Sequence, residues 1–310
     1  MRARGCTVLA YAPPMDTLIL ALPGAERLAE TLAQQLHCAA STLELHRFPD
    51  GEGVVRLRTS VAGRRVLLVA HLDRPDDKTL PLLFAADAAR ELGAKELGLV
   101  APYLPYMRQD ERFRDGEAIT SRSYARLLSG AVDFLVTMDP HLHRWPSLDA
   151  IYTIRTRVVA AAPAIAEWVR REVPQPVLVG PDSESEQWVA DVARRIDAPY
   201  FVMSKVRRGD RDVSVTLPAD AQHAGRTPVL VDDIMSSGHT MAAAVQVLRE
   251  QGWSRPLCVA VHALLDAASQ DMLQRAGVAR IASCDTVPHG TNAIGVASLL
   301  AEGVRELISA

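Results

Sequence analysis

Short apolar strands alternate with amphipathic helices along almost the whole chain. The first strand is expected at Thr17–Leu22, and apolar residues at helical spacing predict a helix at Ala25–His37. The same alternation continues to the last predicted helix, Ala293–Ser309. Strands joined by crossover helices form mostly parallel sheets, so the sequence predicts an α/β fold. Ligands of such folds bind beyond the carboxyl ends of the strands, so the loops there are the first candidates for function.

The length of the chain is sufficient for two sheets of this kind. The protein has 310 residues, and 48% of them are hydrophobic, which is enough for two cores of ordinary size. The alternation runs twice, and the two runs meet near residues 150–157. The second run begins with a helix predicted at Val158–Glu172 and a strand predicted at Pro176–Val179. We therefore expect two similar α/β domains.

The composition disfavours several classes of partner. Lys and Arg number 34 and Asp and Glu number 37, so the net charge is −3, which argues against a nucleic-acid binder or a polybasic membrane binder. Apolar runs stay shorter than the roughly 18 residues that span a membrane. The four cysteines lack the spacing of a zinc module or of a disulfide framework. A reducing, cytoplasmic location is therefore expected.

The first 14 residues have a basic start followed by apolar residues, as a signal peptide does. Pro13, Pro14 and Asp16 interrupt the apolar stretch. We therefore interpret this segment as an extension ahead of the fold, and Met15 could serve as an alternative start.

The segment 229–240 carries the strongest chemical signal. An apolar strand leads into two adjacent carboxylates, Asp232 and Asp233, and a turn of mostly small residues precedes a helix. The turn consists of Ser236, Ser237, Gly238, His239 and Thr240. Backbone N–H groups at a helix N-terminus can hold a phosphate, and the two carboxylates could accept hydrogen bonds from the vicinal hydroxyls of a sugar. The alternative is a capped helix that follows two solvated acids.

This segment resembles the phosphoribosyl-diphosphate (PRPP) binding motif of type I phosphoribosyltransferases and PRPP synthetases. The motif alone does not separate a transferase that consumes PRPP from a synthetase that makes it. Five further segments are similar to those of PRPP synthetases and occur in the family order: Phe48–Glu52, Pro102–Asp110, Met138–His141, Gly180–Asp182 and Lys205–Arg208. By this resemblance the chain is identified as a divergent member of the ribose-phosphate diphosphokinase family.

The resemblance implies two phosphoribosyltransferase-like domains, each a mostly parallel sheet flanked by helices. Residues 15–153 would form the ATP-side domain and residues 154–295 the domain that binds ribose 5-phosphate. A C-terminal helix at about 296–310 could pack back on the first domain. The implied reaction transfers the β,γ-diphosphoryl group of Mg-ATP to the anomeric hydroxyl of ribose 5-phosphate, and PRPP and AMP are its products.

The resemblance also assigns roles to individual residues. Lys205 and Arg207 would stabilise the transition state from a loop that could close over ATP. ATP would be bound by Phe48, Asp50, Gly51, Glu52, Arg108, Gln109 and His141. Ribose 5-phosphate would be bound by Asp232, Asp233, Ser236, Ser237, Gly238, His239 and Thr240. Magnesium would be held by His141 and Asp182. In the family the segment Phe48–Glu52 often reaches the site of a neighbouring subunit, which implies a homo-oligomer built of dimers.

Judged from the residues alone, each of these assignments has a structural alternative. Lys205 and Arg207 lie in a generally charged segment that could be a solvated loop. A lone histidine such as His141 is more often structural than catalytic. The segment Phe48–Glu52 also has the composition of a hairpin turn. His143 lies near His141 and is assigned no role.

The chain departs from the family pattern in two segments of the site. His239 stands where a glycine is common, and Glu184 and Glu186 follow Asp182 where small residues are common. Two other functions compete with the synthetase: a phosphoribosyltransferase that consumes PRPP, and a non-catalytic PRPP-synthetase-like regulatory subunit. The residues expected to hold metal and to close over ATP are all present, which favours an enzyme.

Overall fold

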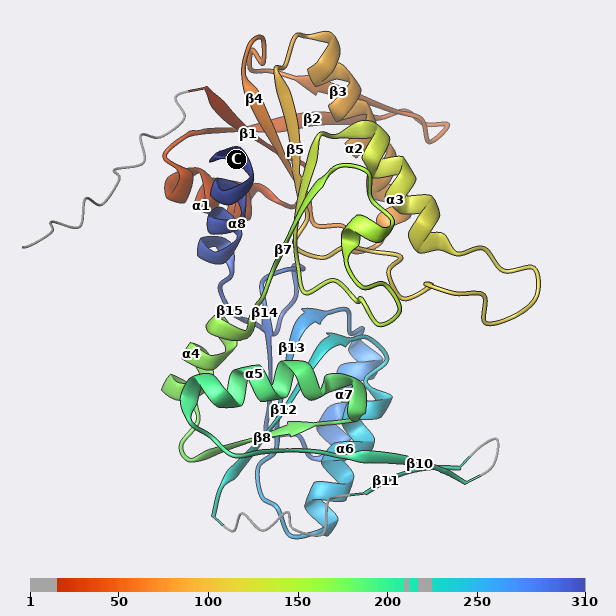
Figure 1. The fold of residues 1–310 in the computed structure, drawn as a ribbon, viewed down its shortest axis with the longest axis vertical. Coiled ribbons are helices and arrows are strands. Elements are labelled where there is room, and N and C mark those ends of the chain that lie inside the picture. Colours follow the sequence, from red (N-terminus) through yellow and green to blue (C-terminus); the bar gives the residue numbers. More distant parts are fainter. Residues whose placement is uncertain (1–15, 209–211, 217–224, 310) are drawn as a thin grey trace, which may run out of the picture.

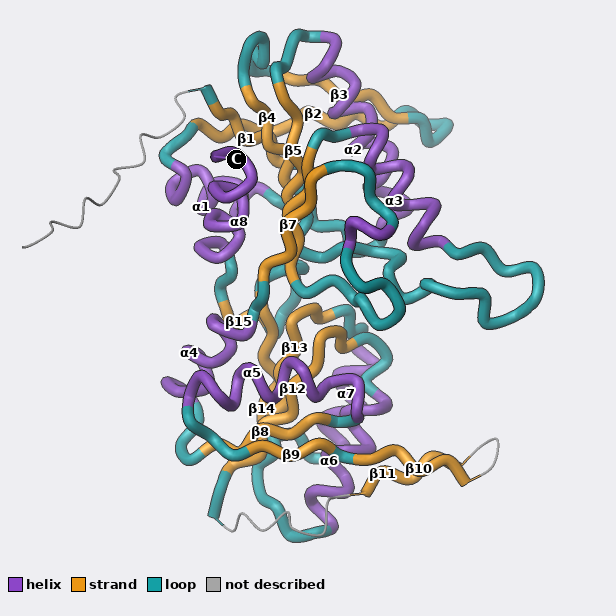
Figure 2. The backbone as a smooth tube through the Cα atoms, viewed as in Figure 1, coloured by secondary structure: helices purple, strands orange, loops and turns teal. Residues whose placement is uncertain are grey.

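The structure, a computed structural model, describes residues 16–208, 212–216 and 225–309. Two larger sheets with their flanking helices lie one above the other along the long axis of the molecule (Figure 1). Loops from both halves meet between the two sheets (Figure 2). The extension predicted at the N-terminus lies outside the described residues.

The first sheet has seven strands in the order β3-β2-β1-β4-β5-β6-β7. These strands are β1 (Thr17–Ala21), β2 (Ala39–Arg47), β3 (Gly53–Leu57), β4 (Arg65–Val69), β5 (Glu96–Val100), β6 (Phe134–Met138) and β7 (Arg155–Val159). Neighbouring strands are parallel except β2 and β3, which form an antiparallel hairpin. The helices that accompany them are α1 (Glu26–Leu36), α2 (Pro75–Glu91), α3 (Thr120–Ala131) and the short η1 (Leu148–Ala150). Alternate residues of β1 enter different cores, Ile19 on one face and Leu18 on the other, so the sheet is covered on both sides.

The second sheet has six strands in the order β15-β14-β13-β12-β8-β9, and all its neighbouring pairs are parallel. These strands are β8 (Pro176–Gly180), β9 (Tyr200–Val202), β12 (Thr227–Met235), β13 (Leu257–Ala263), β14 (Arg280–Cys284) and β15 (Asn292–Ile294). Its helices are α4 (Ala162–Glu172), η2 (Ser183–Ser185), α5 (Glu186–Ile196), α6 (His239–Glu250) and α7 (Ala267–Ala276). A separate antiparallel hairpin consists of β10 (Ser204–Arg208) and β11 (Asp212–Thr216).

The α/β fold with two mostly parallel sheets is confirmed, but the junction between the halves differs from the prediction. Val158 and Val159 end strand β7 and do not begin a helix, because β-branched side chains suit a strand that pairs with β6. The helix starts only at Ala162, with Pro163 in its first turn, where a missing N–H costs no hydrogen bond. Strand β7 belongs to the first sheet, so that sheet extends beyond the predicted boundary at residues 153 and 154.

The last part of the chain returns to the first sheet. Strands β14 and β15 were not predicted, and the final helix, α8 (Ala297–Ser309), begins four residues later than expected. Ile294 is buried in β15, where pairing with β14 overrides the helical pattern of the sequence. Helix α8 packs against α1, β6 and β7 (Figure 1). One buried apolar cluster therefore continues from the first sheet through α8 into the second sheet.

The packing of α8 predicts a destabilising effect of a single methyl group. A Cβ atom at Gly303 would lie 2.6 Å from Cγ2 of Val159 and 3.2 Å from Cγ1 of Val136. These valine side chains are stiff and cannot move aside. Gly303→Ala should therefore lower the free energy of unfolding by about 1–3 kcal/mol, measured by urea denaturation. The matched control is Gly130→Ala in α3, where no atom lies within 4 Å and a gain of up to about 1 kcal/mol is expected. Equal effects of the two substitutions would contradict the packing of α8.

Candidate active site

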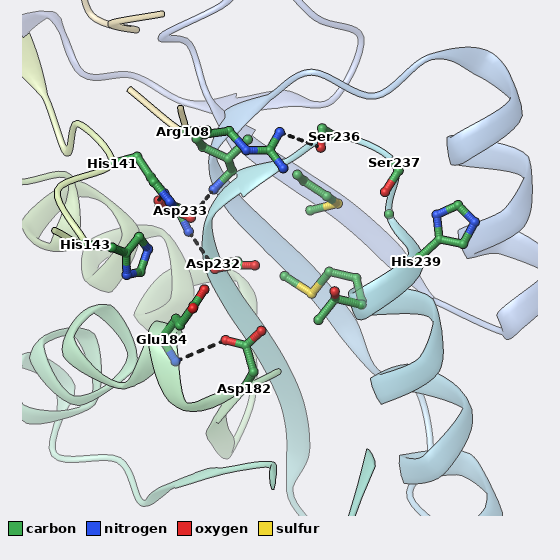
Figure 3. Close-up of a pocket in the computed structure, with 15 residues that line it drawn as sticks. Arg108, His141, His143, Asp182, Glu184, Asp232, Asp233, Ser236, Ser237 and His239 are labelled. Carbon is green, nitrogen blue, oxygen red and sulfur yellow. Dashed lines mark hydrogen bonds and ion pairs between the residues drawn. The ribbon is translucent and has the colours of Figure 1, made fainter. Parts of the chain in front are cut away.

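A pocket lies where the carboxyl ends of strands from both sheets face each other (Figure 3). The second sheet contributes the end of β12 with the turn before α6, and the end of β8 with the turn at η2. The first sheet contributes the loops after β5 and β6. The polar residues that line the pocket are Arg108, His141, His143, Asp182, Glu184, Asp232, Asp233, Ser236, Ser237, His239 and Thr240. The pocket is therefore built jointly by the two halves of the chain.

The turn that precedes α6 has the form expected of a phosphate site. Gly238 adopts φ +73°, a left-handed backbone conformation that strains residues with a Cβ atom, so the position favours glycine. The N-terminus of α6 follows at once, where backbone N–H groups and the helix dipole favour an anion. His239 is exposed, and Figure 3 shows its ring turned away from Asp232. The side chain of His239 therefore leaves the turn open.

A side chain from the first sheet reaches this turn. Arg108 follows β5 and donates from Nη1 to Oγ of Ser236 at 3.2 Å. The guanidinium group is a planar, always charged donor that suits phosphate oxygens. Arg108 thus stands at the border between the predicted ATP side and the predicted sugar side of the pocket.

The two adjacent carboxylates of β12 are not the solvated acids of the alternative interpretation. Asp233 is buried, and its Oδ1 accepts a hydrogen bond from the backbone N–H of Ile234 at 2.7 Å. Burial, together with the neighbouring charges of Asp233 and Asp182, raises the pKa of Asp232 well above its ordinary value. Burial also acts to raise the pKa of Asp233, but the contact with His141, the nearby His262 and the hydrogen bond from Ile234 together lower that pKa. Ionisation of both carboxylates at once is therefore unfavourable unless a cation or a hydrogen-bond donor lies beside them.

The predicted metal ligands both lie in this pocket. Nδ1 of His141 lies 2.7 Å from Oδ2 of Asp233, so the loop after β6 meets the end of β12 directly. Asp182 caps the N-terminus of η2 and accepts a hydrogen bond at Oδ1 from the backbone N–H of Glu184 at 3.1 Å. Glu184 lines the pocket beside Asp182, so the acidic turn faces the site. Carboxylate oxygens of this kind are suitable ligands for magnesium.

A buried histidine fixes the position of the loop that carries His141. His262 of β13 lies with Nε2 at 3.1 Å from the carbonyl oxygen of Met138, and with Nδ1 at 2.9 Å from Oγ1 of Thr286. Nδ1 of His71, from the first sheet, lies 2.9 Å from the carbonyl oxygen of Thr286. Burial lowers the pKa of His262 to about 4, so the ring is neutral at physiological pH.

Several predicted site residues are not brought to the pocket within one chain. Gln109 donates from Nε2 to the carbonyl oxygen of Glu111 at 3.2 Å and to Oε2 of Glu117 at 3.1 Å. Its amide therefore stabilises the conformation of its own loop. Phe48, Asp50, Gly51 and Glu52 form the tip of the β2–β3 hairpin. In this turn Phe48 is 44% exposed and Oδ1 of Asp50 accepts from the N–H of Glu52. The hairpin form was the structural alternative for this segment.

The segment that carries Lys205 and Arg207 is a strand, not the predicted loop. Both belong to β10, which pairs with β11 from Lys205 opposite Val215 to Arg207 opposite Val213. The β-branched residues Val206, Val213 and Val215, each flanked by polar residues, favour such a ribbon. The side chains of Lys205 and Arg207 lie outside the described part of the structure, so their assigned roles stay predictions.

His143 has no role predicted from the sequence, but the structure places it in the pocket. Its ring centroid lies 3.9 Å from that of His141 and 6.2 Å from that of Trp188. The spacing of two histidines separated by one residue, directly after a strand, was the available signal. His262, Thr286 and His71 had no such signal, because only the docking of the two sheets brings them together.

Comparisons with known proteins agree with this geometry. Residues 17–131 match the model of the N-terminal domain of ribose phosphate pyrophosphokinase, and residues 147–299 match the model of the phosphoribosyl transferase domain. A ribose-phosphate pyrophosphokinase of Methanopyrus kandleri is 33% identical over 94% of this chain and 99% of its own. That of Saccharolobus solfataricus is 32% identical over 83% of this chain and 89% of its own.

A solved structure shows the same arrangement of both halves. The crystal structure of phosphoribosylpyrophosphate synthetase from Mycobacterium smegmatis superposes with a TM-score of 0.80 at 26% identity. The match covers 94% of this chain and 99% of the other. With its two phosphoribosyltransferase-type sheets, the protein belongs to the ribose-phosphate pyrophosphokinase family, also called the ribose-phosphate diphosphokinases. Within the described residues, no helix is long and apolar enough to cross a membrane.

The buried ring of His262 predicts a specific loss of stability in acid. The unfolded chain binds a proton at this residue below about pH 6.5, whereas the folded protein resists protonation until about pH 4. The contribution of neutral His262 to the free energy of unfolding is therefore fully present above pH 6.5. It is lost as the pH drops towards 4, by up to about 3 kcal/mol. His262→Gln keeps a donor for Met138 but cannot titrate, so urea denaturation should show a shallower loss over this range. Parallel curves for the two proteins would contradict the assignment.

Proposed function

We propose that the protein is a ribose-phosphate diphosphokinase, which transfers the β,γ-diphosphoryl group of ATP to the anomeric hydroxyl of ribose 5-phosphate and forms PRPP and AMP. One observation carries the proposal. The turn at Ser236–Gly238 and the carboxylates of Asp232 and Asp233 lie in one pocket with Arg108 and His141 from the other sheet. A sugar phosphate and a nucleotide would meet there between the two halves.

Ribose 5-phosphate fits the second-sheet side of this pocket. Its phosphate would accept hydrogen bonds from the backbone N–H groups of the turn, Ser236, Ser237, Gly238, His239 and Thr240. Its vicinal hydroxyls would donate to the carboxylates of Asp232 and Asp233, which lie on the same strand just before the turn. The reaction requires both reactants to be held in one orientation, and such positioning supplies much of the catalysis in phosphoryl transfer.

ATP fits the first-sheet side, where Arg108 and His141 face the turn. Magnesium would be held by Asp182 together with His141, and the donor set fits this ion because the carboxylates of Asp182, Glu184, Asp232 and Asp233 line the pocket as oxygen ligands. Magnesium prefers oxygen ligands and retains waters, so the carboxylates are its better ligands here. When bound, it neutralises charge on the phosphate oxygens of ATP. Gln109, which braces the loop of Arg108, would act by positioning that loop.

Lys205 and Arg207 would stabilise the charge that develops on the transferred group. Phosphoryl transfer demands little covalent chemistry from a protein, so cationic side chains near the reacting phosphates account for most of the effect. The support for this role is the position of the two residues on β10, which leaves the second sheet directly after β9. We assign the reaction to the cytoplasm, as the sequence suggests.

The β2–β3 hairpin supports an oligomer with shared sites. Its tip, Phe48–Glu52, is exposed and contributes nothing to the pocket of its own chain. Phe48, Asp50, Gly51 and Glu52 would complete the ATP site of a second copy, with the Phe48 ring against adenine. The protein would then be active as a dimer or a multiple of dimers.

Removal of the Lys205 ammonium group tests the catalytic assignment. Lys205→Ala should lower the turnover number by about 100-fold or more, because charge stabilisation in the transition state is lost. Binding of ribose 5-phosphate, measured by calorimetry, should change far less. Lys95→Ala, at an exposed position between α2 and β5, is the control and should retain full turnover. AMP release measured by chromatography checks both variants, and unchanged turnover of Lys205→Ala would remove the assignment.

Mixing two inactive variants tests the shared site. Asp50→Ala damages only the hairpin, and Lys205→Ala damages only the strand that serves its own pocket. A mixed dimer would contain one pocket with both parts intact, so an equal mixture after subunit exchange should recover about a quarter of wild-type activity. Native mass spectrometry would confirm that mixed oligomers form. Mixed oligomers without recovered activity would show that each hairpin serves its own chain.

A further inference from the structure

Two loops of the first sheet reach across to the second sheet at the pocket. The loop after β5 spans residues 101–119 and carries Arg108, which donates to Ser236. A connection of this length is uncommon in an α/β domain and has to be held by contacts of its own. The loop after β6 carries His141, which contacts Asp233, and Figure 3 shows both contacts. The first-sheet side of the pocket therefore depends on how these two loops are placed relative to each other.

Arg144, in the loop after β6, joins the two loops. Its Nη1 donates to Oδ1 of Asp110 at 2.9 Å, and its Nη2 lies 2.9 Å from Oε1 of Glu111. The guanidinium group also lies over the ring of Phe113, 5.3 Å from the ring centroid. One side chain of the loop after β6 thus contacts three residues of the loop after β5.

The burial of Asp110 distinguishes this contact from a surface ion pair. The side chain of Asp110 is 1% exposed, whereas that of Glu111 is 46% exposed. Among the described residues, Oδ2 of Asp110 has no hydrogen-bond partner. An exposed ion pair contributes little to stability, but a buried carboxylate that loses its cation is strongly destabilised. Removal of Arg144 therefore favours a rearrangement of the loop around Asp110.

The residue after Arg144 adds a second link between the loops. Nε1 of Trp145 donates to Oγ of Ser121, in the first turn of α3, at 3.3 Å. The backbone N–H of Ser121 donates in turn to the carbonyl oxygen of Gln109 at 3.3 Å. Two consecutive residues of the loop after β6 are therefore linked to the segment next to Arg108 and to the helix that follows it.

We infer that Arg144 is a positioning residue for ATP: its pair with Asp110 places Arg108 relative to His141 so that both face one nucleotide. A single residue separates Asp110 from Arg108, and two residues separate His141 from Arg144. A displacement at the pair is therefore passed on to both, and a misplacement of about 1 Å can cost about 100-fold in rate. The phosphate turn before α6 belongs to the second sheet, so its geometry should not depend on this pair. The inference deepens the proposed function and rests on it for the identity of the nucleotide.

Calorimetry with a non-transferable nucleotide and with ribose 5-phosphate tests the inference. In adenosine 5′-(α,β-methylene)triphosphate a methylene group replaces the oxygen between the α and β phosphorus atoms, where the bond would break. With magnesium present, Arg144→Ala should weaken binding of this analogue about tenfold or more, and should change the affinity for ribose 5-phosphate less than about threefold. Arg144→Lys keeps the charge without the fork and should restore part of the loss. Equal losses for both ligands would indicate general damage to the fold and would overturn the inference.

A double-mutant cycle separates the ion pair from the arginine alone. Asp110→Asn removes the buried charge, so Arg144→Ala should weaken analogue binding much less in that background than in the wild type. Arg275→Ala, which removes an exposed arginine paired with Asp271 at 2.6 Å, is the control and should bind both ligands as the wild type does. Independent effects of the two substitutions, or unchanged analogue binding in Arg144→Ala, would overturn the inference.

Formation of PRPP and AMP, measured in parallel, distinguishes a failure of this inference from a failure of the proposed function. If the wild type forms PRPP while Arg144→Ala binds the analogue normally, the inference fails and the proposed function stands. If the wild type binds the analogue but forms no PRPP, the proposed function fails. The loss of analogue binding in Arg144→Ala would still support the positioning role in that case.

Discussion

The contact between His141 and Asp233 joins the two halves of the protein at the site itself. The histidine follows a strand of the first sheet, the aspartate ends a strand of the second, and their side chains meet at 2.7 Å. Arg108 and Ser236 repeat this relation at 3.2 Å. The geometry of the pocket therefore depends on how the two sheets dock, and the contact of His262 with the Met138 carbonyl holds that docking. A shift between the sheets would separate a bound nucleotide from a bound sugar.

The pocket concentrates negative charge and so depends on cations to work. Burial raises the pKa of Asp232 well above its ordinary value, and the nearby carboxylates of Asp233 and Asp182 raise it further. A site of this kind repels phosphates unless positive charge is supplied. The phosphate turn at the N-terminus of α6 and the guanidinium of Arg108 supply part of it, and bound cations supply the rest. The acidic turn after Asp182 strengthens that dependence in this chain.

The alternation of strands and helices predicted the fold class, and the segment 229–240 predicted the phosphate turn. Both features depend on residues that are close together in the sequence. Strand β7 was not predicted, because the apolar residues from Val158 onward also fit the spacing of a helix. Only the pairing with β6 decides between a strand and a helix there. The place of His143 in the pocket depends on contacts between distant loops. The Phe48–Glu52 tip forms the hairpin turn of the structural alternative, and its expected place in the site of a neighbouring subunit stays a prediction.

Phosphorus NMR of the purified protein with Mg-ATP and ribose 5-phosphate tests the central claim most directly. The account predicts that the ATP resonances decline while AMP and a sugar-linked diphosphate appear together in equal amounts. Release of inorganic phosphate, or of free diphosphate without a sugar-linked product, would show that the pocket does not transfer the diphosphoryl group to the sugar. Intact ATP after prolonged incubation would contradict the account altogether.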